Sequence, residues 1–360
     1  MNRLIIIGNG FDLAHGLKTS YKDFVLDYLC EYINKFNSNL YYSDECINIA
    51  KKNSFRIIHS KANFKLTPEE TLDFISKKLN INDAVDFKIN SSIISKSLSK
   101  IDNLNWVDLE IEYFNELIFT KNLYQTNPNK IKYINNQLEF LKQKLIEYLK
   151  EQQSNFIHNF NKKPLIDSFT ESVYSKEVVT IELKKNERPK NLFFLNFNYT
   201  NTFETYYDEC RKIIPSEFDY IHGDLNDGQG SPIFGFGDEL DKRYLEFEDE
   251  KNNELFRHIK SFEYLKNKNY YRLIRFLESD DYQVQIYGHS CGLSDRTMLN
   301  TIFENEKCKS IKIFYHERED GTNDYTEKTY EISRHFKDKG IMRKKIVPYD
   351  YSKAMPQPKK

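Results

Sequence analysis

The sequence predicts an α/β fold in which a parallel sheet carries helices on both faces and a large α-helical insertion interrupts the chain. Two apolar runs far apart in the 360 residues, 4–7 and 284–287, break on glycine and lead into helix-like sequence, as strands of doubly wound sheets do. Two further apolar runs end on polar residues, near Asn198 and His222. Because parallel strands end at one edge of a sheet, these four strand ends predict a single catalytic edge.

Composition excludes several classes of protein. The 53 Lys and Arg residues against 54 Asp and Glu give a formal charge of −1, so no nucleic-acid partner is indicated. No apolar run is long enough for a membrane span, and residues 4–7 are too short for a signal-peptide core. We therefore expect a soluble, cytoplasmic protein without a membrane partner.

The cysteines indicate neither a disulfide framework nor a metal site. They are five in number, widely spaced and without a C-x-x-C pair, at Cys30, Cys46, Cys210, Cys291 and Cys308. Structural zinc sites and small disulfide-rich domains need paired or closely spaced cysteines. No metal is therefore expected.

The first elements are read from turn and capping signals. A strand over residues 3–7 turns through Gly8, Asn9 and Gly10, and the next helix is expected near Ser20. Ser20 and Asp23 have the spacing of a capping box, in which each side chain accepts from the other residue's backbone amide.

From about residue 36 to 185 the pattern becomes helical. Residues 67–70, with Thr at the cap position, Pro next and Glu at the third helical position, predict a helix start. Trp106 begins another amphipathic segment that carries Glu110 on the same side as Tyr113 or Phe114. A long helix follows residue 128, with apolar residues at near-heptad positions: Ile131, Ile134, Leu138, Leu141, Leu145 and Leu149. No strand of comparable strength is visible between roughly residues 67 and 160.

Strands and helices then alternate again. Strands are expected at 192–197, up to 222, at 284–287 and at 310–315, with a further candidate at 232–236; helices are expected at 202–213, 254–277 and after a cap at Ser294. This alternation predicts a discontinuous nucleotide-binding core over 1–35 and 186–345, a mainly helical insertion over 36–185 and a tail over 346–360. The last residues, 356–360, are expected to be disordered.

The turn at Gly8, Asn9 and Gly10 is typical of a Rossmann-like sheet. Glycine lets the backbone approach a phosphate closely and aim its amides at it. The G-x-G-x-x-G pattern is incomplete, because its third glycine position holds Leu13. A tight turn that binds nothing is the alternative interpretation.

Asn198 and His222 are the sharpest candidates for chemistry. Each follows an apolar strand by one or two residues, so both are expected at the same sheet edge. An Asn amide can hold a water or a sugar hydroxyl without titrating, and His can accept a proton near neutral pH. The alternative is that Asn198 caps a helix and His222 satisfies a turn, and spacing does not separate the two.

A third hypothesis comes from residues 288–292, which match the G-x-S-x-G elbow of serine hydrolases. Ser290 would be the nucleophile, and His335 with Asp320 or Asp324 would complete the triad. Only one convincing strand follows Ser290, whereas that fold places several beyond its elbow.

Together these residues resemble the abortive-infection AbiH family of anti-phage proteins. Residues 6–21 are similar to the N-terminal signature of that family almost throughout, and the blocks at 106–110, 198–202 and 286–290 match its later motifs in order. The resemblance spans about residues 4–316.

More remotely, the same blocks resemble the sirtuin-like NAD-binding fold. This resemblance implies that cofactor-binding residues come from the first loop (Gly8, Asn9, Gly10, Asp12) and from the last motif (Gly288, Ser290, Asp295), while Asn198 and His222 flank the nicotinamide ribose. Thr200 stands where that motif usually has Asp, which bears on recognition of nicotinamide. The paired cysteines of the deacetylases' zinc module are missing, so deacetylation is not expected.

The resemblance leads to an anti-phage effector that cleaves NAD, its substrate, at the nicotinamide–ribose bond, with Asn198, His222 and Glu110 as catalytic residues. The first alternative is a sensor or interaction protein that binds NAD or ADP-ribose without turnover, and the second is the serine hydrolase. The apolar stripe over residues 131–149 suggests self-association or contact with a phage trigger through the insertion. Packing within the insertion is the other interpretation.

Overall fold

The computed structural model describes residues 1–39, 41–51, 66–79, 85–104, 108–123, 128–156, 159–183, 185–226 and 228–358. The chain forms two compact units. The sheet unit comprises Met1–Leu17, Leu149–Lys251 and His258–Lys360, and the insert unit comprises Lys18–Tyr148 and Asn252–Arg257. Among the described residues, no helix is both long and apolar enough to cross a membrane.

A six-stranded sheet, parallel throughout, organises the sheet unit. Its order is β6-β5-β1-β7-β8-β9. The strands are β1 (Asn2–Ile7), β5 (Leu192–Asn196), β6 (Ser216–Tyr220), β7 (Tyr282–Tyr287), β8 (Cys308–Tyr315) and β9 (Lys353–Ala354). The chain runs outward from β1 to β6 and then crosses to β7 on the other side of β1. The strand order therefore reverses between β1 and β7, and ligands of open α/β sheets bind at the carboxyl side of such a reversal.

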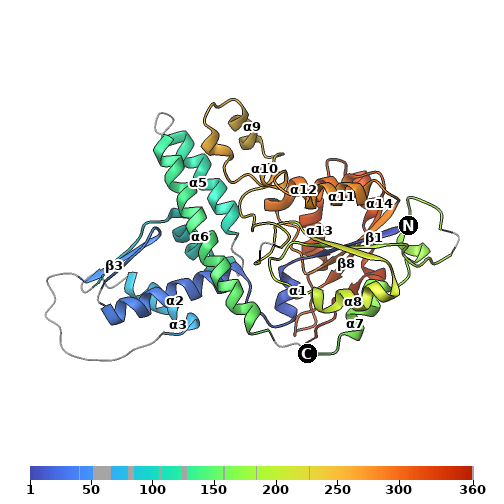
Figure 1. Ribbon diagram of the computed structural model, residues 1–360, viewed down its shortest axis with the longest axis horizontal. Helices are drawn as coiled ribbons and strands as arrows, with labels where there is room; N and C mark the ends of the chain where they lie inside the picture. The colour runs from blue at the N-terminus through green and yellow to red at the C-terminus, as the bar shows by residue number, and fades with distance from the viewer. Residues whose placement is uncertain are drawn as a thin grey trace. The chain divides into compact units, whose positions relative to one another are not determined.

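Helices cover both faces of this sheet, as predicted. Alternate residues of β1 point to opposite faces, so that Leu4 and Ile6 join one core and Ile5 and Ile7 join the other. The first core includes residues of α10 (Lys260–Tyr264), α11 (Asn269–Leu277), α12 (Arg296–Glu304) and α13 (Tyr325–Ser333), and α14 (Lys339–Lys345) packs against it through the partly buried Met342. The second includes residues of α1 (Asn9–Ala14), α7 (Lys163–Thr170) and α8 (Glu204–Ile213). Figure 1 shows α11 and α12 on one side of the strands and α7 and α8 on the other.

The connections add shorter elements. They are α9 (Lys242–Glu248) and the 3-10 turns η1 (Ser175–Glu177), η2 (Asn253–Phe256), η3 (Leu293–Asp295) and η4 (Tyr349–Tyr351). The helix expected over 254–277 is thus divided into η2, α10 and α11. A polar stretch separates the last two, and the Oδ1 of Asn267 accepts from the backbone N of Asn269 at 2.9 Å, which starts α11 anew.

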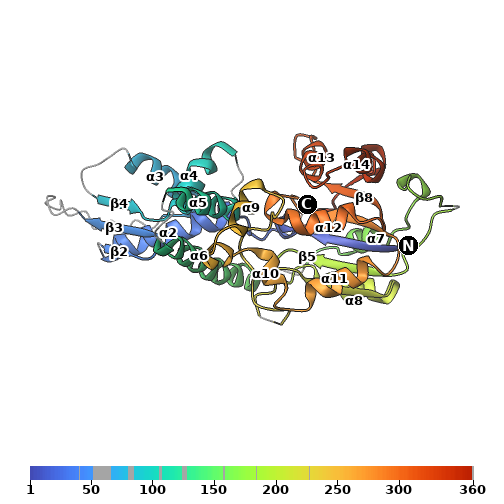
Figure 2. The ribbon, with the colours of Figure 1, turned by 90° about the horizontal axis from the view of Figure 1, so that it is seen from above.

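The insert unit is mainly helical but also contains a small sheet. Its helices are α2 (Tyr21–Asn39), α3 (Pro68–Leu79), α4 (Ser92–Leu104), α5 (Leu109–Leu123) and α6 (Pro128–Ser154), the last of which runs on into the sheet unit. Strands β2 (Tyr41–Ser43), β3 (Ile47–Lys51) and β4 (Val85–Ile89) form an antiparallel sheet, visible in Figure 2. The expectation of no strand between about 67 and 160 is therefore wrong at β4. Five residues of alternating polarity carry too little signal beside long amphipathic helices.

Helix starts that follow local capping chemistry were predicted correctly. Before α2, the Ser20 hydroxyl accepts from the backbone N of Asp23 at 3.1 Å, and the Asp23 carboxylate accepts from the backbone N of Ser20 at 3.3 Å. Before α3, the backbone N of Thr67 donates to Glu70 at 2.8 Å. The expected apolar stripe of α6 is buried. Helix α1 was missed, because its cap is Gly8, which has no side chain to signal a start.

The chain beyond residue 346 contributes to the sheet. Strand β9 pairs with β8, and the backbone N of Met355 donates to the carbonyl of Tyr315 at 2.8 Å. The side-chain amide of Gln357 donates to the carbonyl of Met355 at 3.1 Å. Of the residues expected to be disordered, 359 and 360 lie outside the described part of the chain.

The loop after β1 and the end of β7 meet at the strand-order reversal. The backbone N of Gly10 donates to the carbonyl of Gly288 at 2.8 Å, and Gly288 has a φ of +66°. A Cβ added to Gly288 would lie 2.1 Å from the backbone N of Phe11. Glycine is therefore required here by both backbone conformation and space.

Gly288→Ala is expected to lower the free energy of unfolding by at least about 3 kcal/mol, because it adds a backbone clash to the strain of a left-handed residue. Gly321→Ala is the matched control. Gly321 also has a positive φ, of +79°, but a Cβ there would meet nothing within 4 Å. The control should lose roughly 1 kcal/mol. Equal losses of the two variants in urea denaturation would contradict the close approach.

Candidate functional site

The candidate site lies at the carboxyl edge of the sheet, around the strand-order reversal. Gly8 follows β1, Asn198 lies two residues after β5, His222 lies two residues after β6, and Gly288 follows β7. The structure thus places the four predicted strand ends on neighbouring strands. Asn198 and His222 are both buried.

Asn198 is fixed by hydrogen bonds to two neighbouring strand ends. Its backbone N donates to the Oδ1 of Asn196 at 3.1 Å, and its side-chain Nδ2 donates to the carbonyl of Gly8 at 3.1 Å. These bonds orient the amide, so that its Oδ1 is the atom left to accept a hydrogen bond from a water or a hydroxyl. The alternative role of Asn198 as a helix cap does not account for the bond to Gly8.

Asp12 and Thr200 form a buried pair behind this loop. The Thr200 hydroxyl donates to Oδ2 of Asp12 at 2.5 Å, and both side chains are about 1% exposed. Burial raises the pKa of Asp12 to about 6, although bonds from Thr200, Thr202 and Asn198 oppose the shift. Asp12, expected to bind the cofactor, is engaged in holding α1 against the loop after β5.

The centre of the site is the carboxylate of Asp295, which receives three nitrogen groups. Oδ1 lies 2.8 Å from Nζ of Lys260 and 3.1 Å from Nε2 of His222, and Oδ2 lies 3.7 Å from Nε2 of His289. These four residues are between 0 and 9% exposed. Asp295 occupies the N-cap position of α12, where a negative charge is favourable. Because its carboxylate faces the histidines and Lys260, it makes no side-chain cap among the described residues, and the expected cap at Ser294 is displaced by one residue.

Hydrogen bonding fixes the proton of His289. Its Nδ1 accepts from the backbone N of Cys291 at 2.9 Å, so in the neutral ring the proton lies on Nε2 and faces Asp295. An ionised carboxylate can only accept, so the Nε2 of His222 also carries a proton towards Oδ1. The Tyr264 hydroxyl lies 3.1 Å from the same Nε2, and its ring stacks on His222 at 6.1 Å.

Burial and charge determine the protonation of the cluster. Burial opposes the charge of Asp295, but the Lys260 ammonium and the His222 ring hold the pKa of this carboxyl well below its usual range. Burial lowers the pKa of His222, with Lys260 acting in the same direction, while Asp295 and a hydrogen bond to the backbone of Phe197 oppose the shift. Burial lowers the pKa of His289 to about 3. At neutral pH the site therefore combines a carboxylate, an ammonium and two uncharged imidazoles.

This arrangement suits proton transfer. A neutral imidazole can act as a base, and a carboxylate against its other nitrogen stabilises the imidazolium that forms. Among the described residues, no group of three or more His, Cys, Asp or Glu side chains is arranged to hold a metal ion.

The residues of the serine-hydrolase hypothesis do not assemble into a triad. The Nε2 of His335 lies 2.7 Å from the carbonyl of Cys291, and the Asp320 carboxylate accepts from Thr322. Asp324 accepts from the backbone N of His316. Apart from Gly288, the left-handed residue in the loop after β7 is Cys291 rather than Ser290, with a φ of +57°, and burial raises the pKa of the Cys291 thiol to about 12. Ser290 is half-buried and accepts a long bond, 3.4 Å, from the backbone N of Gly292.

The other predicted residues lie in different places. Asn9, Gly10 and Gly288 are half-buried, whereas Gly8 is buried against His289. Glu110 is a buried residue of α5 in the insert unit, where Asp108 caps the helix, so its place at the site stays a prediction. Trp106 lies outside the described residues.

Three residues of the cluster were missed as site residues: His289, Lys260 and Tyr264. His289 follows β7 as His222 follows β6, so the rule that found His222 also applies to it. Lys260 has no comparable signal. An isolated parallel bridge between Phe236 and Ile259 fixes the backbone next to Lys260. Gly237 has no side chain, and this leaves space for the side chain of Lys260. Both contacts are non-local.

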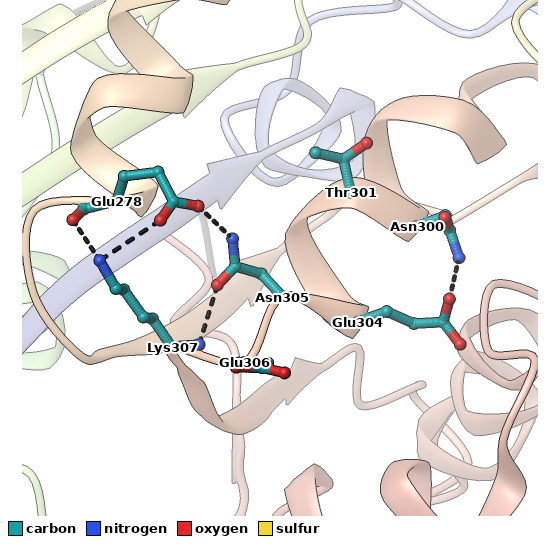
Figure 3. Close-up of a pocket in the computed structure, with 7 residues that line it drawn as sticks. All are labelled: Glu278, Asn300, Thr301, Glu304, Asn305, Glu306 and Lys307. Carbon is teal, nitrogen blue, oxygen red and sulfur yellow. Dashed lines mark hydrogen bonds and ion pairs between the residues drawn. The ribbon is translucent and has the colours of Figure 1, made fainter.

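A separate pocket of about 420 Å³ lies at the opposite, amino-terminal edge of the sheet. Figure 3 shows its polar lining at the ends of α11 and α12: Glu278, Asn300, Thr301, Glu304, Asn305, Glu306 and Lys307. Its polar groups bond one another: Asn305 donates to Glu278 at 2.9 Å, and Asn300 donates to Glu304 at 2.7 Å. Because this pocket lies away from the strand-order reversal, it is not the candidate site.

Comparison with known proteins gives one family. A family model described as bacteriophage abortive infection AbiH matches residues 4–317, in agreement with the resemblance read from the sequence. No curated protein matches the chain.

Asp12→Asn is expected to affect the free energy of unfolding more favourably at high pH than at low pH. The pKa of Asp12 rises from 3.8 to about 6 on folding, so the folded protein binds this proton more tightly and loses stability as the pH rises through that window. The difference in unfolding free energy between variant and wild type should shift by roughly 2 kcal/mol in favour of Asn between pH 4 and pH 8.

Asp320→Asn is the control with the opposite sign. Asp320 is exposed, and hydrogen bonds from Thr322 lower its pKa, so removing its charge should be less favourable at high pH. Chemical denaturation across this pH range measures both. A pH-independent difference for Asp12→Asn would contradict its buried, protonatable state.

Proposed function

The chain belongs to the bacteriophage abortive infection AbiH family, and from this premise we propose that it is an effector that cleaves NAD at the nicotinamide–ribose bond. Membership of the family gives the chain a role in abortive infection. The observation that carries the proposed reaction is a neutral, carboxylate-backed His222 next to Asn198. The His222 ring lies 5.3 Å from the ring of Phe197 and 6.3 Å from that of Tyr199, the residues on either side of Asn198.

The sheet supports a dinucleotide as the ligand. Numbered along the chain, its strands have the order 3-2-1-4-5-6, and Rossmann-like sheets of this order bind dinucleotides at the reversal beside strand 1. The candidate residues lie on the loops at this reversal. The half-buried backbone of Asn9, Gly10 and Gly288 would face the pyrophosphate, and Ser290 would face the adenosine side.

The proposed reaction breaks the bond between ribose C1′ and the nicotinamide nitrogen, with both electrons leaving on nicotinamide. Water then attacks the oxocarbenium-like ribose to give ADP-ribose. Asn198 would accept a hydrogen bond from this water through Oδ1, and His222 would take the proton that the water loses. Asp295 would stabilise the resulting imidazolium. NAD is consumed as a substrate.

A second candidate function is binding of NAD or ADP-ribose without turnover. It is favoured by Thr200, which replaces the Asp of the sirtuin-like motif and already donates its hydroxyl to Asp12 at 2.5 Å. That hydroxyl is therefore not directed at a nicotinamide carboxamide. Calorimetric binding of NAD together with an absence of products by mass spectrometry, with and without phage lysate, would favour this function.

We also propose that the insert unit contacts a second copy of the chain or a phage trigger. The apolar stripe of α6 is buried, but Phe119 and Leu123 on α5 are exposed, at 54 and 57%. Exposed large apolar side chains of this kind are compatible with a partner surface.

Asn198→Ala and His222→Ala are each expected to reduce nicotinamide release from NAD by about 100-fold, the usual contribution of a positioned proton-transfer group. Release is measured by chromatography with and without phage lysate, alongside protection of cells from phage. Asn155→Ala and His316→Ala, both at exposed positions, are matched controls that should retain activity. Unchanged release in either site variant would rule out its assigned role.

Glu110→Gln tests whether the insert unit supplies a catalytic carboxylate. Gln keeps the shape of Glu110, so we expect lower turnover or cell toxicity with a nearly unchanged melting temperature. Glu112 on the same helix is the contrast, because it forms an ion pair with Lys100. Glu112→Gln should lower the melting temperature and leave turnover unaffected. Full activity of folded Glu110→Gln would return Glu110 to a structural role.

A further inference from the structure

The Asp295 carboxylate faces a lysine ammonium in addition to two histidine rings. Lys260 Nζ, His222 Nε2 and His289 Nε2 converge on two carboxylate oxygens, at 2.8, 3.1 and 3.7 Å. The four residues come from four places in the sequence: the loop after β6, the start of α10, the loop after β7 and the cap of α12. One carboxylate therefore connects these four segments of the chain.

We propose that Asp295 is a positioning residue, which holds the rings of His222 and His289 in place while Lys260 supplies its counter-charge. The resemblance read from the sequence gives Asp295 a different role, a contact to the cofactor. The catalytic consequence of our inference rests on the proposed NAD cleavage, whereas the geometric part does not.

Lys260 makes this arrangement possible. A carboxylate in the interior is costly without a cation, and the Lys260 side chain is fully buried, so each group compensates the other. The backbone of Lys260 is fixed by donating to the carbonyl of Phe236 at 2.9 Å. A Cβ at Gly237 would lie 3.2 Å from Cδ of Lys260 and 2.6 Å from the carbonyl of Ser294, so glycine lets these segments approach.

The second histidine is fixed from its other side as well. The backbone N of Cys291 holds Nδ1 of His289, and Nζ of Lys328 donates to the His289 carbonyl at 2.9 Å. The His289 ring also packs on Phe197 at 4.2 Å, and Phe197 packs in turn on His222. The two rings are thus linked through Phe197 and through Asp295.

An amide cannot replace this carboxylate. Asn at position 295 would offer one acceptor atom to three donors, so its NH₂ group would face either a histidine N–H or the Lys260 ammonium. Since Cys291 fixes the proton of His289 on Nε2, the mismatch must be relieved by a shift of a ring or by a changed tautomer. A changed tautomer or a displaced histidine ring is therefore an observable effect that loss of a purely structural contact would not produce.

The test uses the full-length protein with ¹⁵N-labelled histidine, with the signals of the two rings assigned through His222→Gln and His289→Gln. In the wild type, both rings should be neutral at pH 7.5 with the proton on Nε2. In Asp295→Asn at least one ring should change tautomer or be displaced, and kcat for nicotinamide release should fall about 100-fold with KM nearly unchanged. Asp320→Asn, the same substitution at an exposed position, should alter neither the histidine ring signals nor kcat.

Lys260→Met and the double variant Lys260→Met/Asp295→Asn keep the inference testable if Asp295→Asn folds poorly. Lys260→Met leaves a buried carboxylate unpaired and should lower the melting temperature. The double variant removes both charges, so its loss of stability should be smaller than the two single losses added together. It should still show the altered histidine signals.

The outcomes separate this inference from the proposed function. Altered ring signals in Asp295→Asn, together with no nicotinamide release by the wild-type protein, would support the positioning role and overturn NAD cleavage. Nicotinamide release at the wild-type rate by folded Asp295→Asn or by the double variant would overturn the positioning role and leave NAD cleavage standing. Unchanged ring signals or strictly additive stability losses would also overturn it.

Discussion

A charged side chain buried in the sheet unit is stable only when opposite charges or hydrogen-bond partners are buried with it, and this constraint governs how the unit is built. The sheet is covered on both faces, yet β1 and β8 carry the fully buried Arg3 and Lys312. Lys312 is paired with Glu171 at 2.6 Å and with Glu177 at 2.7 Å. Arg3 donates to the carbonyl of Glu171 and, at 3.0 Å, to Gln283. Because removing one partner would strand a buried charge, the segment around η1 is locked to this face.

The same constraint has a chemical consequence at the carboxyl edge. The network around Lys312 balances its cations with Glu171 and Glu177, and no imidazole among the described residues takes part in its ion pairs. Around Asp295, by contrast, Lys260 balances the carboxylate and two uncharged imidazoles complete its hydrogen bonds. The pairing that makes the buried charge tolerable therefore also sets the protonation of His222, which is the property a general base requires.

The sequence predicted what local patterns encode. Apolar runs located the four central strands, and the loops that follow β5 and β6 delivered Asn198 and His222 to one edge because parallel strands end together. Capping residues located α2 and α3 for the same local reason. Lys260 escaped prediction because its role depends on contacts with Phe236 and Asp295, which no periodicity records. Sequence patterns also named Asp295 but could not show that it faces His222.

The glycine motif illustrates how a correct local signal can leave its meaning open. Gly8 was expected to admit a phosphate, and a Cβ there would indeed meet another group, the Cα of His289, at 2.4 Å. What approaches Gly8 on that side is thus the chain itself. Glycine at this turn would be needed with or without a nucleotide, since it lets the end of β7 come close enough for His289 to reach Asp295. A glycine-rich turn after β1 is therefore compatible with both turnover and simple binding of NAD. The proposed turnover would use the pairing of a neutral His222 with an ionised Asp295, whereas simple binding of a nucleotide does not require a base with a carboxylate behind it.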